Sequence, residues 1–153
     1  MRIVAAVVST ALVIGYAVGS GVWVSSGDAW YRSLVQPPWQ PPDIVFGLIW
    51  PYNFLALIVA GLVVSLTGSP GQRWVWLIGL AGSVAAALGW AYSFYVGQQL
   101  WVAAALLCLA LVITVPIVVV AWRTAWWAGA ILLPYVIWVA LASSLAVGYA
   151  ARN

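Results

Sequence analysis

Three of the 12 tryptophans lie inside long apolar segments rather than at their ends. They are Trp50, Trp90 and Trp138. An indole ring offers a flat face for stacking and one N–H donor, and lipid supplies no acceptor for that donor. We therefore expect the three rings to face the protein interior or a ligand. Two interpretations stay open: an aromatic pocket, or large core residues that pack helix against helix.

The other polar residues support few kinds of chemistry. The chain has no His, one Cys and one Met, so His or thiolate metal sites lack ligands, and we predict no metal and no cofactor. A hydrolytic triad lacks His, and no ionisable residue lies within a span to couple transport to an ion. Haem iron would lack a His or internal Met ligand. A metal-free, flat, apolar ligand fits this chain better.

The elements that position these residues follow from composition. Hydrophobic residues make up 67% of the 153 positions and charged residues only 5%, a balance that requires lipid as the solvent. We predict an all-α membrane protein, a bundle of five transmembrane helices in a single domain over residues 1–153. The predicted spans are residues 3–23, 44–66, 74–96, 100–120 and 125–149.

The long first connection, residues 24–43, is called the lid loop. Its prolines disfavour regular helix and favour a stiff, extended path. Counted from the lid-loop side, Trp50 and Trp90 lie about 9 Å deep and Trp138 about 16 Å deep. This geometry predicts an aromatic pocket beneath a lid that includes Trp30, Pro37, Pro38, Trp39, Pro41 and Pro42.

Single charges and the remaining tryptophans mark the ends of the spans. The five arginines are scattered singly, which favours membrane anchoring and excludes nucleic acid as a partner. Three of them (Arg2, Arg73 and Arg123) share one side of the bilayer, so we expect a cytoplasmic N-terminus and an outward lid loop. Tryptophans near span ends are typical anchors at the lipid interface; these are Trp23, Trp74, Trp76, Trp101, Trp122, Trp126 and Trp127.

Four motifs follow one another along the whole chain. They are Trp30-Tyr31-x-x-Leu34-x-x-Pro37-Pro38-Trp39-x-Pro41-Pro42, Phe46-Gly47-x-x-Trp50, Ala91-Tyr92-Ser93, and Pro134-Tyr135-x-x-Trp138-x-x-x-Ala142-x-x-Leu145. This pattern resembles the translocator protein family, also called tryptophan-rich sensory or peripheral benzodiazepine receptor-like proteins.

The resemblance implies a five-helix fold, often a homodimer, in a membrane such as the bacterial cell membrane. It implies a tetrapyrrole ligand such as protoporphyrin IX, or a sterol-like small molecule, bound under the first loop. The family's pocket positions correspond here to Tyr31, Trp50, Tyr135, Trp138 and Ala142. In several bacterial members the pocket tryptophans are implicated in light-dependent porphyrin breakdown.

Further candidate ligand-binding residues are Trp90, Tyr92, Asn53 and Arg32. Arg32 could pair with ligand carboxylates, although an arginine beside a span is more often an interface anchor. Members of the family usually have an Asn where this chain has Gly89, a Trp where it has Tyr92, and an Asn where it has Ala146.

Two further patterns concern lipids and assembly. Val147-x-Tyr149-x-x-Arg152 fits a pattern proposed for cholesterol contact, but Tyr and Arg at a span end are ordinary anchors. Gly15-x-x-x-Gly19 and Gly82-x-x-x-Ala86 permit close helix approach, either between two copies or within one chain.

Three functions therefore compete. The leading hypothesis is a membrane receptor or carrier for tetrapyrrole-like or other flat apolar ligands. The alternatives are a light-dependent porphyrin-degrading enzyme and a structural or accessory subunit of a larger membrane complex.

Overall fold

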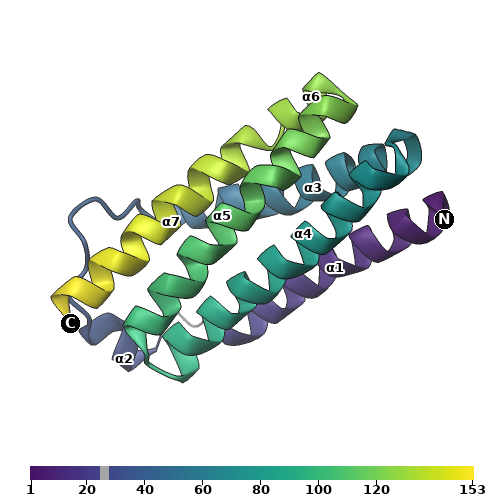
Figure 1. Cartoon of the computed structure of the whole chain (residues 1–153). Helices are drawn as coiled ribbons and strands as arrows, with labels where there is room; N and C mark the ends of the chain where they lie inside the picture. The colour runs from purple at the N-terminus through teal and green to yellow at the C-terminus, as the bar shows by residue number, and fades with distance from the viewer. Residues whose placement is uncertain (25–27) are drawn as a thin grey trace.

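Five long helices dominate the computed structural model, which describes residues 1–24 and 28–153 (Figure 1). Residues 25–27 of the lid loop lie outside the described part. The five segments long and apolar enough to cross a membrane are Arg2–Trp23, Asp43–Thr67, Pro70–Val96, Leu100–Thr124 and Trp126–Arg152. At about 1.5 Å of rise per residue, each is long enough for roughly 30 Å of hydrocarbon. The predicted all-α bundle of five transmembrane helices is confirmed.

Local sequence explains where the helices begin and break. The helices are α1 (Arg2–Trp23), α2 (Ala29–Ser33), α3 (Asp43–Thr67), α4 (Pro70–Ala91) with its π-helical continuation η1 (Tyr92–Val96), α5 (Leu100–Thr124), α6 (Trp126–Ala130) and α7 (Leu133–Arg152). α4 begins four residues before the predicted span because Ser69 and Gln72 form a capping box and Pro70 occupies the first turn. The predicted last span is two helices, α6 and α7, that meet just before Pro134.

The helices form a ring with one loosely closed seam. α4 lies along α5, α5 along α7, and α1 along both α3 and α4, whereas the backbones of α3 and α7 seldom approach each other. The two termini lie at opposite ends of the bundle, and α2 lies at the end where α7 finishes (Figure 1). Side chains rather than backbone contacts must therefore fill the space between α3 and α7 below the lid loop.

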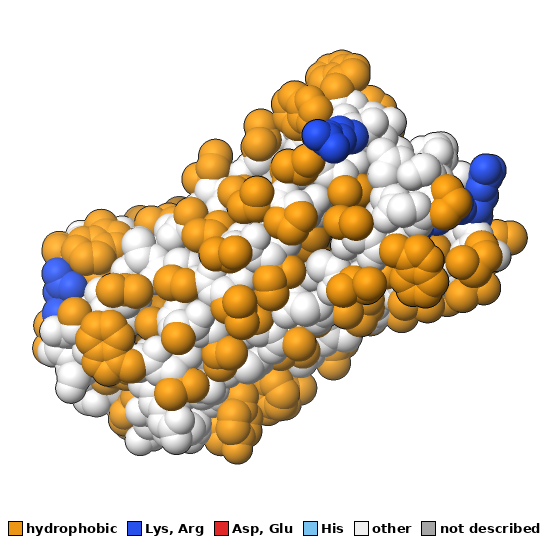
Figure 2. All heavy atoms as spheres, in the orientation of Figure 1, with side chains coloured by type: hydrophobic (Ala, Val, Ile, Leu, Met, Phe, Trp, Pro, Cys, Tyr) orange, Lys and Arg blue, Asp and Glu red, His pale blue; other side chains and the backbone are white. Residues whose placement is uncertain are grey.

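The outer surface suits lipid. Figure 2 shows hydrophobic side chains along the length of the bundle, with arginine side chains only near its two ends on this face. Each of the five spans exposes large apolar side chains, for example Ile3, Leu48, Ile78, Val112 and Ile137, which are 67–74% exposed. In water such a surface would aggregate, so the chain is a multi-pass integral membrane protein.

Trp76 corrects one sequence-based prediction. We expected an interface anchor, but Trp76 is 0% exposed and its Nε1 donates a hydrogen bond to Ser9 Oγ at 2.8 Å. The early start of α4 places Trp76 nearly two turns inside the helix, on the face toward α1 and α3. Gly61 of α3 leaves room for the ring, because a Cβ there would come within 3.2 Å of it. Of the six other predicted anchors, Trp23 is half-buried against Tyr92. The remaining five are 42–69% exposed: Trp74, Trp101, Trp122, Trp126 and Trp127.

The small-residue seams are used at least partly within the chain. A Cβ on Gly19 would lie 2.8 Å from Leu88 of α4, and one on Gly82 would lie 3.6 Å from Ile113 of α5. Nothing lies within 4 Å of the corresponding point on Gly15. These contacts describe intramolecular helix packing, and the homodimer stays a prediction.

Candidate ligand-binding site

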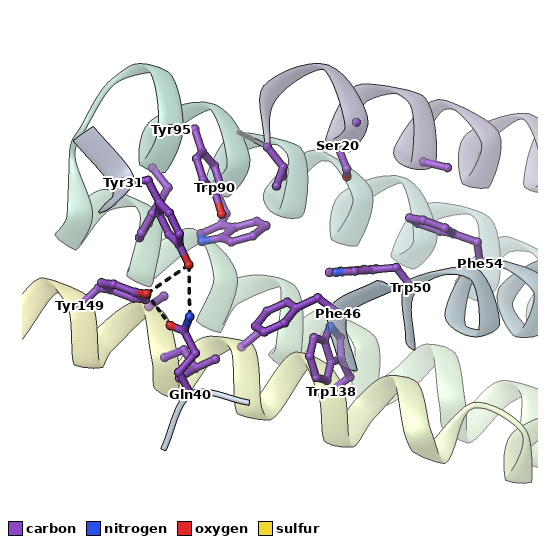
Figure 3. Close-up of a pocket in the computed structure, with 17 residues that line it drawn as sticks. Ser20, Tyr31, Gln40, Phe46, Trp50, Phe54, Trp90, Tyr95, Trp138 and Tyr149 are labelled. Carbon is purple, nitrogen blue, oxygen red and sulfur yellow. Dashed lines mark hydrogen bonds between the residues drawn. The ribbon is translucent and has the colours of Figure 1, made fainter. Parts of the chain in front are cut away.

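A cavity of about 320 Å³ lies between α1, α3, the η1 end of α4, α7 and the lid loop. Aromatic rings form most of its wall: Tyr31, Phe46, Trp50, Phe54, Trp90, Phe94, Tyr95, Trp138 and Tyr149. Small residues on α1 and α7 leave the space between these rings: Ala17, Ser20, Gly21, Ala142 and Ala146. The volume is at the lower end of the roughly 300–1,000 Å³ range of ligand pockets. Figure 3 shows two groups of side chains facing each other across the cavity.

The inner group consists of aromatic side chains that lie between α3 and α7, namely Phe46, Trp50, Phe54 and Trp138. The Trp50 and Trp138 ring centroids are 6.3 Å apart with their planes at 86°, and Trp50 is stacked on Phe54 at 5.5 Å. Phe46 meets Trp138 edge to face at 5.0 Å. These rings hold α3 and α7 apart where their backbones make few contacts. Because the two indole planes are perpendicular, a flat ligand can stack on only one of the two faces.

The outer group, defined as Tyr31, Gln40 and Tyr149, is a hydrogen-bonded triad under the lid loop. Gln40 Nε2 donates to Tyr31 Oη at 3.3 Å, and Tyr149 Oη lies 3.2 Å from Tyr31 Oη. Tyr149 Oη also donates to Gln40 Oε1. The triad joins α2, the proline-rich run and α7, and Figure 3 shows it closing one end of the cavity.

The π-helical turn η1 brings neighbouring aromatic residues to one wall. Its wider turn is closed by a hydrogen bond from the Gly97 N–H to the Tyr92 carbonyl at 2.9 Å. Phe94 and Tyr95, which are adjacent in sequence, both line the cavity with Trp90. Tyr95 lies 5.7 Å from Tyr31, ring to ring. Single π-helical turns inside α-helices are rare and occur often at functional sites.

The lid loop is fastened to the last turns of α7. Trp39 Nε1 donates to Ser144 Oγ at 3.2 Å, and the Arg152 guanidinium lies 4.8 Å over the Trp39 ring. Asn153 pairs with the Val35 backbone through its side-chain oxygen at 2.9 Å and its side-chain nitrogen at 3.3 Å. Gly148 permits this contact, since a Cβ there would lie 2.8 Å from Pro37 and 2.9 Å from Trp39.

The cavity carries hydrogen-bond donors but no charge. Among the described residues, none of those lining it is Asp, Glu, Lys, Arg or His. Trp90 Nε1 and Trp138 Nε1 are both buried and have no acceptor in the described part of the chain. A buried donor without an acceptor costs free energy. Chemically, the cavity can stack against a ligand, exclude water and donate hydrogen bonds, and the lining residues that the structure describes include no acid–base–nucleophile set for hydrolysis.

The structure brings five of the nine predicted ligand-binding residues to the cavity wall: Tyr31, Trp50, Trp90, Trp138 and Ala142. The other four lie elsewhere. Tyr135 is 2% exposed in the main helix core, and Asn53 is 0% exposed, with its amide unpaired among the described residues. Tyr92 is 50% exposed and meets Trp23 edge to face, and Arg32 is exposed. Their ligand-binding roles stay predictions, without a cavity contact to support them.

The predicted lid residues differ in position. Trp30 meets Phe94 edge to face at 5.7 Å, Pro37 is buried, and Trp39 packs against α7. Pro38 and Pro42 are exposed and Pro41 is half-buried. None of these six lines the cavity, whereas their neighbours Tyr31 and Gln40 do.

The departures from the family pattern have separate surroundings. Gly89 faces α5, where a Cβ would lie 3.2 Å from Leu106, while Ala146 lines the cavity. In the proposed cholesterol pattern, Tyr149 is 4% exposed and points into the cavity, whereas Val147 is 40% exposed. The residues of that pattern therefore do not share one lipid-facing surface.

Sequence reasoning missed several lining residues, some of which left a signal. Ala17, Ser20 and Gly21 have the i, i+3, i+4 spacing of one helix face, so three small residues there indicate space beside α1. Gln40 is a polar residue inside a proline run. Phe94 and Tyr95 left no usable signal, because an α-helical period places them on different faces.

Comparison with known proteins agrees with this architecture. The family model described as TspO/MBR family matches residues 4–152. The chain is 33% identical over 138 residues to the "Uncharacterized membrane protein YtaB" of Bacillus subtilis, covering 87% of each protein. It is 32% identical over 136 residues to the "Tryptophan-rich protein TspO" of Chlorobaculum tepidum, covering 88% of this chain and 85% of that protein. It is 29% identical over 125 residues to "Protein CrtK" of Rhodobacter capsulatus, covering 80% of this chain and 77% of that protein. A match across nearly the whole chain, on a bundle of five transmembrane helices, means that this protein belongs to the TspO/MBR family.

Proposed function

We propose that this protein is a membrane receptor or carrier for a flat, apolar, tetrapyrrole-like ligand held in the cavity beneath the lid loop. The observation that carries the proposal is the cavity itself, about 320 Å³ in volume and walled by aromatic rings from three spans and the lid loop. Each offset aromatic stack contributes on the order of 1 kcal/mol beyond area burial. A planar macrocycle uses such a wall more fully than a flexible ligand of equal size.

The lid loop adds a route by which binding can be regulated. Its hydrogen bonds to α7 run through Gln40, Trp39 and Val35, so a ligand that enters past the lid loop must disturb contacts at the end of α7. Ligand occupancy of the cavity could therefore change the surface that the lid loop and the end of α7 present to a partner, as a receptor or carrier requires.

Direct titration tests the proposal. The purified protein in detergent is titrated with protoporphyrin IX, haem and a sterol, and tryptophan fluorescence is followed. We expect saturable quenching with the porphyrin, because Trp50, Trp90 and Trp138 border the cavity. Quenching that rises linearly with all three compounds would mean partition into detergent, and would favour the accessory-subunit alternative.

A second candidate, light-dependent porphyrin breakdown, is favoured by the same three indoles, since a bound macrocycle would contact oxidisable rings. Illumination of the saturated complex distinguishes it from binding alone. New absorbance bands in the light and none in the dark, lost when Trp50 and Trp138 are replaced by Phe, support breakdown. An unchanged spectrum after illumination leaves binding as the function.

A further inference from the structure

We propose that a groove on the outside of the bundle, between α5 and α7, binds one anionic phospholipid of the surrounding bilayer. The lipid phosphate lies against Arg152, and one acyl chain runs along the groove toward the middle of the membrane. The groove is separate from the cavity beneath the lid loop. The inference therefore goes beyond the proposed function and does not depend on what the cavity binds.

The groove has a volume of about 480 Å³. Small residues of α7 form its floor, α5 forms one side, and the lid loop and the last turn of α7 form its mouth: Ser143, Gly148, Ala151, Cys108, Trp39 and Arg152. The hydroxyls of Ser143 and Ser144 donate to carbonyls of α7 itself, at 2.8 and 2.7 Å. The surface left for an occupant is therefore mainly apolar and suits a hydrocarbon chain.

The length of the groove matches one leaflet of a bilayer. At about 1.5 Å of rise per residue, Ser143 lies about 13 Å below Arg152 on α7, and Cys108 lies about 12 Å below Leu100, where α5 begins. The end of α7 and the beginning of α5 are at the same end of the bundle (Figure 1). Half of a hydrocarbon core of roughly 30 Å is about 15 Å. Arg152 is thus at headgroup level, and the deep end of the groove is near the bilayer middle.

Arg152 supplies the charge that a phosphate requires. Its guanidinium lies 4.8 Å over the Trp39 ring and donates to the Gly148 carbonyl at 3.1 Å. Neither contact neutralises the guanidinium, and its other N–H groups can donate to phosphate oxygens. None of the charged side chains that the structure describes in the lid loop lines the groove. The mouth of the groove therefore favours an anion.

The same charge favours a phospholipid over a sterol. A sterol offers only a neutral hydroxyl, which leaves the guanidinium without a counter-charge. The three residues of the cholesterol pattern also separate here, because Tyr149 lines the cavity while Val147 and Arg152 line the groove. The groove thus presents a different set of residues, with a cation at one end and apolar surface below it.

The lid loop shares a wall with this groove. Trp39 borders the groove and is 45% exposed, and its Nε1 donates to Ser144 Oγ at 3.2 Å. A lipid in the groove packs against the exposed part of the ring and holds the loop on α7. Anionic lipid should therefore make the lid loop less mobile.

Cys108, the only cysteine in the chain, reports occupancy of the deep end of the groove. The full-length protein, delipidated in detergent, is titrated with phosphatidylglycerol, phosphatidylcholine of identical acyl chains, or cholesterol. Alkylation of Cys108 by N-ethylmaleimide is followed by mass spectrometry, and native mass spectrometry counts the lipids retained. We expect phosphatidylglycerol to protect Cys108 at about fivefold lower mole fraction than phosphatidylcholine, with one molecule retained. Equal effects of the two phospholipids, or a stronger effect of cholesterol, would overturn the proposal.

A charge variant tests the headgroup contact. Arg152→Gln should abolish the preference for phosphatidylglycerol, and Arg123→Gln, at the opposite end of the bundle, should leave it unchanged. Equal losses in the two variants would mean a general surface effect and would overturn the assignment to Arg152.

A steric variant tests the acyl-chain contact. Ala151→Phe places a ring in the groove and should remove the retained lipid, whereas Ala85→Phe, at an exposed position on α4, should not. Retention of the lipid by the Ala151→Phe protein would show that the lipid binds elsewhere.

Hydrogen exchange tests the link to the lid loop. Without any cavity ligand, amides of residues 31–36 should exchange more slowly in phosphatidylglycerol than in phosphatidylcholine, and this difference between lipids should vanish in Arg152→Gln. The same exchange rates in both lipids for the wild-type protein would overturn the link.

Discussion

The two halves of the bundle differ in whether the N–H group of a buried tryptophan has a hydrogen-bond acceptor. In the half near the N-terminus, Trp76 is fully buried and its N–H is satisfied by Ser9 across the contact with α1. In the half beneath the lid loop, Trp138 is also buried, at 5% exposure, and its N–H has no acceptor in the described chain. The first ring completes a core, and the second borders a cavity.

The small residues differ in the same way. Gly61 brings α3 so close that a Cβ would collide with Ser9 Oγ and the Trp76 ring. Ala142 and Ala146 of α7 instead border open space between aromatic rings. Small residues thus allow close helix packing in one half and leave a cavity in the other. Substitutions in the packed half should therefore change the stability of the protein, and substitutions in the cavity half should change ligand affinity. The following variants test that separation, beginning with the largest expected effect.

Trp76→Ala should destabilise the protein by about 3 to 5 kcal/mol, since it leaves a cavity among three helices and removes a buried hydrogen bond. Unfolding in mixed detergent micelles measures the cost. Ligand affinity, measured per folded molecule, should stay unchanged. Trp74→Ala is the control, because that ring is 54% exposed. Equal costs for the two variants would contradict the packed-half assignment.

Trp50→Ala and Trp138→Ala should each weaken porphyrin binding by roughly 2 to 4 kcal/mol, because each removes aromatic surface from the cavity wall. One of the two perpendicular rings can stack on a flat ligand and the other meets it edge to face. Phe at either position should retain much of the affinity. Titration by fluorescence or absorbance measures the effect, with Trp126→Phe as the control on the opposite end of the bundle. Wild-type affinity in folded Ala variants would mean that the ligand binds elsewhere, and similar losses in all variants would indicate general destabilisation.

Gly61→Ala should cost about 1 to 3 kcal/mol of stability, because the added methyl group overpacks the junction of α1, α3 and α4. Gly47→Ala is a matched control on the same helix, with nothing within 4 Å of the added Cβ. Thermal unfolding of both variants, side by side, gives the difference. A Gly61→Ala protein as stable as Gly47→Ala would show that the junction relaxes freely.

Tyr149→Phe should loosen the lid loop by about 1 to 2 kcal/mol, because it removes the hydroxyl that meets both Tyr31 and Gln40. Amide hydrogen exchange over residues 31–36 should become faster in this variant and slower when ligand is added to the wild type. Tyr52→Phe, whose hydroxyl donates to the Ile131 carbonyl at 2.9 Å, is the control. Unchanged exchange at saturating ligand would argue against a lid that covers the site.

The sequence predicts the spans well because lipid imposes simple rules. A run of about 20 apolar residues bounded by single charges or prolines leaves few alternatives to a membrane helix. The predicted start of the third span is wrong because a local helix-capping signal lies before it. The capping box at Ser69 and Gln72 starts α4 early, and this shift turns Trp76 from a predicted anchor into a core residue.

Part of the site could also be predicted from the sequence, but for a different reason. Depth within a span follows from counting residues, and this places Trp50, Trp90 and Trp138 in the same half of the bundle. The direction of a side chain around its helix needs the helix to be regular. At about 100° per residue, Tyr95 would point well away from Trp90, and only the wider turn of η1 returns it to the cavity.

The pairing of Asn153 with Val35 has a practical consequence for anyone who handles this protein. The side chain of Asn153 hydrogen-bonds the lid loop through both its oxygen and its nitrogen. A purification tag or fluorescent fusion attached directly after Asn153 places bulk beside the loop that covers the cavity. Labels fused ahead of Met1, at the far end of the bundle (Figure 1), avoid this interference.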